Sequence, residues 1–190
     1  LHTFFVGEAV SIKTLATIAE LYTVKGKAEL VHGEIVSRAP TGDDPGFASL
    51  KVAARLLTYT EQTRRGRAYG DGVGFHVQLP HRESFSPDAA YHVGPRMGMR
   101  FPEGAPTFAV EIRSANDYGP AAERDMAARR ADYFACGTLV VWDVDLLGTD
   151  VIKSYKASDP DHPVIFRRGD SAEAEPAVPG WRMAVDDLFE

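Results

Sequence analysis

Residues 108–113 read Phe-Ala-Val-Glu-Ile-Arg, and this stretch decides the fold. Its large apolar residues alternate with the other three, which is the period of a β-strand whose successive side chains point to opposite faces. The stretch is therefore predicted to bury an apolar face and to present Glu111 and Arg113 together on the other face.

A second acidic residue, Asp88, directly follows Pro87 within a segment, 84–93, that is predicted to be a strand. Hydrolysis of a phosphodiester requires a hard cation on oxygen ligands, which neutralises developing charge and lowers the pKa of the attacking water. Asp88 and Glu111 are therefore candidate ligands of Mg²⁺ or Mn²⁺, with their carboxylates a few ångströms apart on adjacent strands. The spacing leaves an alternative open, in which Asp88 is a turn residue and Glu111 and Arg113 are an exposed pair on an edge strand.

The surrounding sequence predicts three helices and a series of short strands. The residue pattern places helices at 11–24, 47–65 and 121–135, a hairpin at 28–38 with its turn at Gly33, and strands at 75–79, 139–144, 151–155 and 164–167, followed by a terminal segment at 183–189. This order predicts an α/β fold with a mixed central β-sheet flanked by helices, in a single domain over residues 1–190. Trp142 and Tyr133 are expected in its core.

Composition limits the classes of function. The formal net charge of -6 argues against a protein that coats nucleic acid by charge alone, so any contact with DNA has to be local. The lone Cys136 excludes an intrachain disulfide and fits a reducing compartment. No apolar run is long enough to cross a bilayer, and residues 1–10 lack the pattern of a secretion signal. We expect a cytoplasmic protein with no membrane partner.

Four blocks of the chain, taken together, resemble the Uma-two family of restriction-endonuclease-like proteins in the PD-(D/E)XK nuclease superfamily. The blocks occur in the family's order, at residues 28–36, 86–88, 108–114 and 133–143. The resemblance implies a restriction-endonuclease-like fold, a Mg²⁺-dependent or Mn²⁺-dependent endonuclease and DNA as substrate. It implies that Asp88 and Glu111 are the metal ligands, that the carbonyl of Ile112 completes the coordination, and that Glu34 is a further acidic residue of the cleft. From the residues alone, Glu34 can equally be a solvent-facing hairpin residue.

Two departures from the family pattern bear on catalysis. Arg129 stands where the family often has lysine, on one helical face with Met126 and Tyr133, and is predicted to point to the cleft of Asp88 and Glu111. Like Arg113, it can stabilise transition-state charge but does not readily act as a base. The segment 42–49 also lacks the histidine that is common in the family.

These departures leave two functions open. The chain is either a metal-dependent DNA endonuclease or a catalytically degenerate nuclease-fold module that acts in binding or assembly. Nucleases that cut both strands commonly pair two sites by twofold symmetry, so a homodimer is expected.

Overall fold

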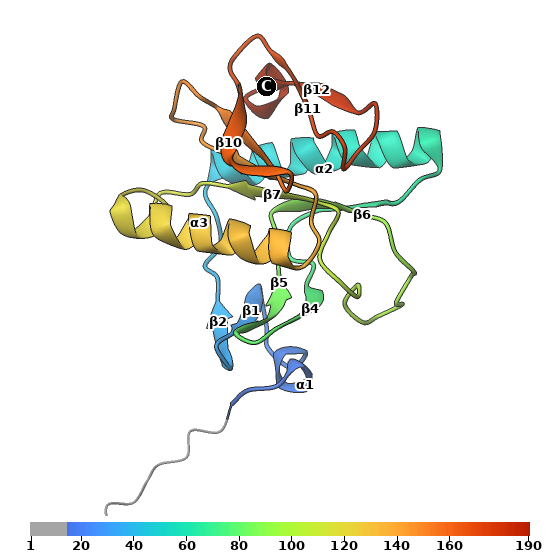
Figure 1. Ribbon diagram of the computed structural model, residues 1–190, viewed down its shortest axis with the longest axis vertical. Coiled ribbons are helices and arrows are strands. Elements are labelled where there is room, and N and C mark those ends of the chain that lie inside the picture. The colour runs from blue at the N-terminus through green and yellow to red at the C-terminus, as the bar shows by residue number, and fades with distance from the viewer. Residues whose placement is uncertain (1–14) are drawn as a thin grey trace, which may run out of the picture.

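The computed structural model describes residues 15–190 and contains a six-stranded mixed sheet between two long helices (Figure 1). The strand order is β10-β9-β8-β7-β6-β3, with β7 and β8 parallel and the other neighbours antiparallel. The strands are β3 (Arg67–Tyr69), β6 (Ala89–His92), β7 (Phe108–Ile112), β8 (Val140–Val144), β9 (Ile152–Lys156) and β10 (Asp159–Phe166). The predicted α/β class with a mixed sheet flanked by helices is confirmed.

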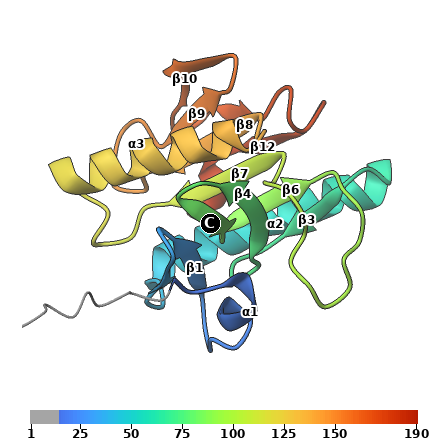
Figure 2. The same cartoon turned by 60° about the horizontal axis from the view of Figure 1, so that its bottom comes forward.

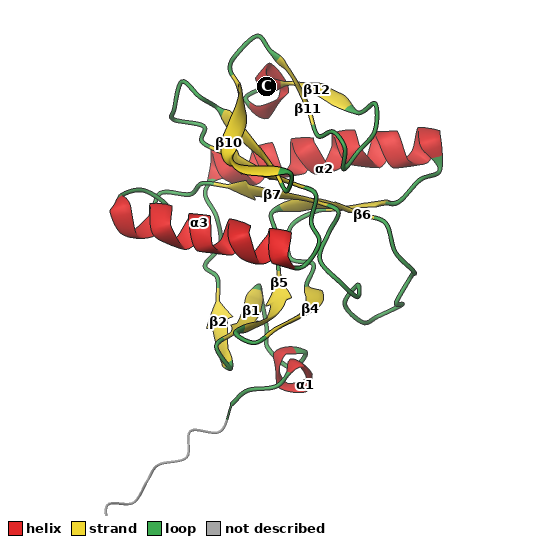
Figure 3. Ribbon diagram, in the orientation of Figure 1, coloured by secondary structure: helices red, strands yellow, loops and turns green. Residues whose placement is uncertain are grey.

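The alternation in β7 places its residues on two faces as predicted, and each face belongs to a separate half of the core. Phe108, Val110 and Ile112 belong to the half shared with α2 (Asp43–Thr63), where Trp142 is fully buried. Ala109 belongs to the other half, which contains Tyr133 of α3 (Pro120–Ala135). Figure 3 shows the two helices on either side of the sheet. Glu111 therefore lies on the α3 side of the sheet.

Both long helices begin and end close to the predicted residues, for local reasons. The first was expected at residues 47–65, but α2 begins four residues earlier, with Asp43 and Asp44 in its first turn, where acidic side chains favour the helix dipole. It ends at Thr63, before Arg64 in the left-handed conformation. Pro120 occupies a permitted first-turn position in α3, and Gly137 follows its end with φ +95°, which suits glycine.

A second, four-stranded sheet lies beside the predicted central sheet and was not predicted. Its order is β2-β1-β5-β4, with β1 (Ala28–Val31), β2 (Glu34–Ser37), β4 (Phe75–Leu79) and β5 (Arg82–Phe85). The predicted hairpin is β1 and β2, and Gly33 has the expected positive φ of 68°. The predicted strand 84–93 is in fact two strands: β5 ends in the small sheet at Phe85, and β6 begins in the large sheet at Ala89.

The two ends of the described chain lie at opposite ends of the molecule. Figures 1 and 2 show α1 (Ile18–Leu21) beside β1, away from β9 and β10. The predicted helix 11–24 is shortened to α1, and its residues 11–14 lie outside the described part. The terminal segment forms β12 (Arg182–Ala184), paired with β11 (Ser171–Glu173), and the 3₁₀ turn η1 (Val185–Leu188). Within residues 15–190, no helix is both long and apolar enough to span a membrane.

Candidate functional site

Asp88 and Glu111 lie on the same face of two adjacent strands. The antiparallel register of β6 and β7 pairs Ala89 with Val110, so its continuation by one residue places Asp88 opposite Glu111. The Asp88 carboxylate is held at β7 by a hydrogen bond, which its Oδ2 accepts from the backbone amide of Ile112 at 2.7 Å. Both side chains are partly exposed, at 21% for Asp88 and 25% for Glu111. The predicted shared face is confirmed.

Lys27 provides the cation next to Asp88, and sequence reasoning missed it. Its Nζ lies 2.7 Å from Asp88 Oδ1 and 2.6 Å from Asp71 Oδ1, and it immediately precedes β1. Burial alone lowers the pKa of Lys27, but Asp88, Asp71 and Glu111 outweigh it, so the net shift is upward. Lys27 is therefore held as an ammonium among carboxylates.

Glu29, on β1, is the most deeply buried acid of the cluster and was also missed. Both terminal nitrogens of Arg129 donate to it at 2.5 Å, Arg82 donates from Nη1 at 3.0 Å, and the amide of Ser86 donates at 2.6 Å. Burial raises the pKa of Glu29, but the guanidinium groups of Arg129, Arg82 and Arg38 reverse the shift and bring the pKa to about 2. A fully buried, ionised carboxylate is tolerated because these donors satisfy it.

Arg129 and Tyr133, one helical turn apart on α3, both hold Glu111. Arg129 Nε lies 2.8 Å from Glu111 Oε1, and the Tyr133 hydroxyl donates to the same oxygen at 2.6 Å. The Tyr133 ring stacks on Phe85 with centroids 3.9 Å apart, which fixes the hydroxyl. Arg129 thus contacts Glu111, toward which the sequence predicted it to point, and its guanidinium joins the two sheets.

The two carboxylates bound by Arg129 are shifted in opposite directions. Burial raises the pKa of Glu111, Arg129 opposes the shift, and the charges of Asp88 and Glu29 raise the pKa further. Burial lowers the pKa of Arg129, but Glu111 and Glu29 raise it well above its ordinary value. Arg129 therefore stays charged, while the pKa of Glu111 lies above its ordinary value.

The depressed pKa of Glu29 predicts a loss of stability in acid. Its stabilisation is fully present above the unfolded pKa of 4.5 and is lost as the pH falls toward the folded pKa of about 2. The difference corresponds to about 3 kcal/mol, part of which the raised pKa of Glu111 offsets. We expect the free energy of unfolding from urea titrations to fall between about pH 5 and 3 in the wild type. The fall should be much smaller in Glu29→Gln, and equal slopes would contradict this role.

Arg113 does not contact Asp88 or Glu111, which corrects the expectation that it shares their cleft. Its guanidinium donates to Asp143 from Nε at 2.9 Å and from Nη2 at 2.8 Å, and it also binds Glu123 of α3. The predicted face is consistent with the structure, because Asp143 is the register neighbour of Glu111 on β8. Asp143 and Glu123 hold the Arg113 side chain, which is 4% exposed, beside the cluster.

Glu34 is the first residue of β2 and its side chain is exposed. It pairs with Val31, so it lies nearer to the hairpin turn than Glu29 does. The hairpin carboxylate that contacts Arg129 is Glu29. The structure thus favours the solvent-facing alternative for Glu34 and assigns the buried acidic position to Glu29. Lys27 and Glu29 have one sequence signal in common: they are alternate residues flanking Ala28, at the start of a strand.

The cluster offers two carboxylates, Asp88 and Glu111, as ligands for a hard divalent cation. Within residues 15–190, no group of three or more His, Cys, Asp or Glu side chains is arranged to hold a metal ion. Asp88 and Glu111 offer carboxylate oxygens, the ligands that Mg²⁺ prefers, and Mg²⁺ commonly uses one or two carboxylates with waters. Arg129 and Tyr133 both engage Oε1 of Glu111, which leaves Oε2 outside these two contacts. A metal ion at Asp88 would compete with the Lys27 ammonium, which already contacts Asp88 Oδ1.

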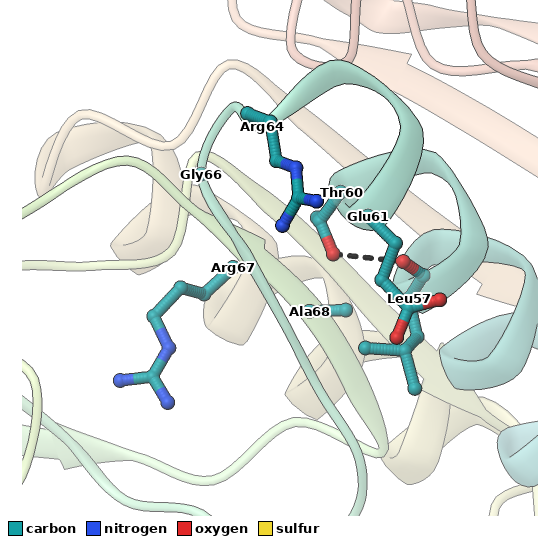
Figure 4. A pocket seen from close by; sticks show the side chains of 7 residues that line it. All are labelled: Leu57, Thr60, Glu61, Arg64, Gly66, Arg67 and Ala68. Atoms are coloured by element: carbon teal, nitrogen blue, oxygen red, sulfur yellow. Dashed lines mark hydrogen bonds between the residues drawn. The ribbon is translucent and has the colours of Figure 1, made fainter.

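A pocket of 340 Å³ lies away from this cluster, at the end of α2 and along β3 (Figure 4). Arg64 and Arg67 line it, and Glu61 is the one carboxylate among its lining residues. A single carboxylate does not make a site for a hard dication, so we do not assign metal chemistry to this pocket.

Comparisons with known proteins agree with this fold. The sequence model of the family Uma2, described as "Putative restriction endonuclease", matches residues 16–186. The crystal structure of a "putative nuclease belonging to DUF820" from Anabaena variabilis has a TM-score of 0.70, at 15% identity, over 91% of this chain and 97% of that chain. At this identity the likeness shows the fold alone. The curated proteins contain no match to the chain.

Proposed function

The chain belongs to the Uma2 family of restriction-endonuclease-like proteins, and from this membership we propose that it hydrolyses phosphodiester bonds in DNA with Mg²⁺ or Mn²⁺. The observation that carries the proposal is the placement of Asp88 and Glu111 on one face of adjacent strands, both partly exposed. In this proposal the two carboxylates hold the metal ion, and the carbonyl of Ile112 is a third ligand.

The reaction joins the oxygen of one water molecule to phosphorus and breaks one P–O ester bond. A proton from the water ends on the departing alkoxide, so the products are a phosphate monoester and an alcohol. A bound divalent ion supplies Lewis acidity and lowers the pKa of the attacking water. Arg129 and Tyr133 act on Glu111 as positioning residues, because together they fix its Oε1. Arg113 is committed to Asp143 and Glu123, so it does not stabilise the transition state in this proposal.

One observation favours the second candidate, a nuclease-fold module that binds without cutting. Arg129 occupies the position where the resemblance placed a lysine, and it engages Glu29 and Glu111 at once. A guanidinium in this position occupies both carboxylates, and unlike a lysine it does not readily lose a proton to act as a base.

Metal-dependent cleavage separates the two functions. We expect the purified chain to cut supercoiled or linear DNA with Mg²⁺ or Mn²⁺ and not with excess EDTA. Absence of cleavage with either metal, across double-stranded, single-stranded and branched DNA, would favour the binding module. Dimer formation stays a prediction. Size-exclusion chromatography with light scattering, which measures the molar mass of the protein in solution, tests it.

Arg129→Lys is expected to preserve or raise cleavage if the chain is a nuclease. A lysine ammonium keeps the positive charge, but it lacks the planar fork that holds Glu29 and Glu111 together, so Glu111 is freer to bind metal. Arg130→Lys is the matched control, since Arg130 is the next residue of α3 and lies over the Tyr155 ring. Initial cleavage rates should stay level in the control. If a folded Arg129→Lys loses cleavage at saturating Mn²⁺, the arginine fork is required and our reasoning is wrong.

A further inference from the structure

The cations around the carboxylates differ in how far they are committed to protein partners. Arg129 binds Glu29 and Glu111, and Arg113 binds Asp143 and Glu123. Arg82 is likewise held by Glu29 and Asp132. All three side chains are at least 89% buried, since none exceeds 11% exposure. A phosphate group has little access to any of these guanidinium groups.

Lys27 differs from these three cations because it contacts Asp88 and is less buried, whereas Arg38, whose side chain is 46% exposed, pairs with Glu29 at 3.6 Å. The Lys27 side chain is 19% exposed, and besides Asp88 it contacts Asp71, whose own side chain is 44% exposed. If Asp88 held a metal ion, that ion would compete with Lys27 for its carboxylate, and Lys27 would keep Asp71 as a partner. An ammonium on a flexible stem, held by one exposed carboxylate, is then available to an incoming anion.

The surroundings of Lys27 include a pocket with a second polar group. This pocket of 120 Å³ is lined by Lys27 and Ser86 together with Gly26 and Gly72. The Ser86 hydroxyl oxygen is buried and has no hydrogen-bond partner within residues 15–190. Lys27 lines this pocket and also contacts Asp88, which lies two residues after Ser86.

We propose that Lys27 is a catalytic residue whose ammonium binds the substrate phosphate beside Asp88, a role that rests on the proposed nuclease function. Lys27 thereby replaces the cation that neither Arg113 nor Arg129 can provide. Charge placed at a transferring phosphoryl group stabilises the transition state more than the ground state, because negative charge grows on its oxygens.

The test uses Lys27→Gln, with Lys25→Gln as the matched control. Lys25 is exposed and lies two residues away, so its replacement removes the same charge without touching Asp88. Mn²⁺ affinity is measured by calorimetry, and cleavage is measured at saturating Mn²⁺ for each variant. DNA affinity is measured by fluorescence anisotropy in Ca²⁺.

Lys27→Gln should bind Mn²⁺ several-fold more tightly, because a competing cation is gone, yet cleave about 100-fold more slowly at saturation. Its DNA affinity should fall about tenfold relative to Lys25→Gln. A lysine that only neutralises Asp88 would give tighter metal binding with unchanged or faster cleavage, and that result overturns the proposal. If the wild type cuts nothing, the nuclease function fails, and DNA affinity decides the role of Lys27. Equal affinity of the two variants then rejects phosphate binding, and a selective loss in Lys27→Gln supports it.

Discussion

Asp88→Asn is expected to reduce Mn²⁺-dependent DNA cleavage by at least about 1,000-fold, a loss of about 4 kcal/mol of transition-state stabilisation. The substitution keeps the shape of the side chain, and an amide oxygen can still accept from the amide of Ile112. It removes the negative charge that stands opposite Glu111, so a dication is left with one carboxylate. Calorimetry should show a matching loss of Mn²⁺ affinity.

The control for Asp88→Asn is Asp125→Asn, at an exposed position of α3. It makes the same change of charge and should leave both cleavage and Mn²⁺ affinity near the wild-type values. Circular dichroism must show that both variants are folded. Cleavage by Asp88→Asn at the wild-type rate would refute the assignment of Asp88 as a metal ligand.

Glu29→Gln is expected to have the largest effect on stability, about 3–5 kcal/mol, because it leaves Arg129 and Arg82 buried without their shared counterion. The amide group can accept from only one side, and its own NH₂ faces guanidinium donors. For a chain of this size, such a loss lowers the melting temperature by roughly 10 °C. Thermal and urea unfolding followed by circular dichroism measure it.

Glu34→Gln is the matched control, on the neighbouring strand of the same hairpin. Because the Glu34 side chain is exposed, even an ion pair there contributes at most about 1 kcal/mol, so the loss of unfolding free energy should stay well below that of Glu29→Gln. An equal loss in both variants would mean that the hairpin, and not the buried ion cluster, carries the effect.

The alternation of residues 108–113 was enough to predict which residues of β7 share a face, because a strand has a fixed side-chain period. It did not predict that both faces are buried. The division of residues 84–93 between two sheets was beyond such reasoning. No period marks the point where a chain leaves one sheet for another, and residues 86–88 carry only a proline as a sign of it.

The candidate site shows the same limit at the level of side chains. The common face of Asp88 and Glu111 follows from strand pairing, so it could be predicted. Glu29 could not, because an acid between Ala28 and Leu30 has the pattern of a solvent-facing strand residue. Its burial depends on Arg129, which is distant in the sequence. Arg113 was correctly predicted to lie on the same face as Glu111. Its partners, Asp143 of β8 and Glu123 of α3, are not specified by the local sequence.

The passage of the chain from β5 to β6 ties the position of Asp88 to the relative orientation of the two sheets. Three residues, 86–88, span the change of sheet, and Pro87 stiffens them by fixing its own φ. Any rotation of the small sheet against the large one must therefore be absorbed next to the Asp88 carboxylate. Arg129 opposes that rotation, since it forms ion pairs with Glu29 on one sheet and with Glu111 on the other. A rotation of the small sheet would therefore change the position of the Asp88 carboxylate relative to Glu111.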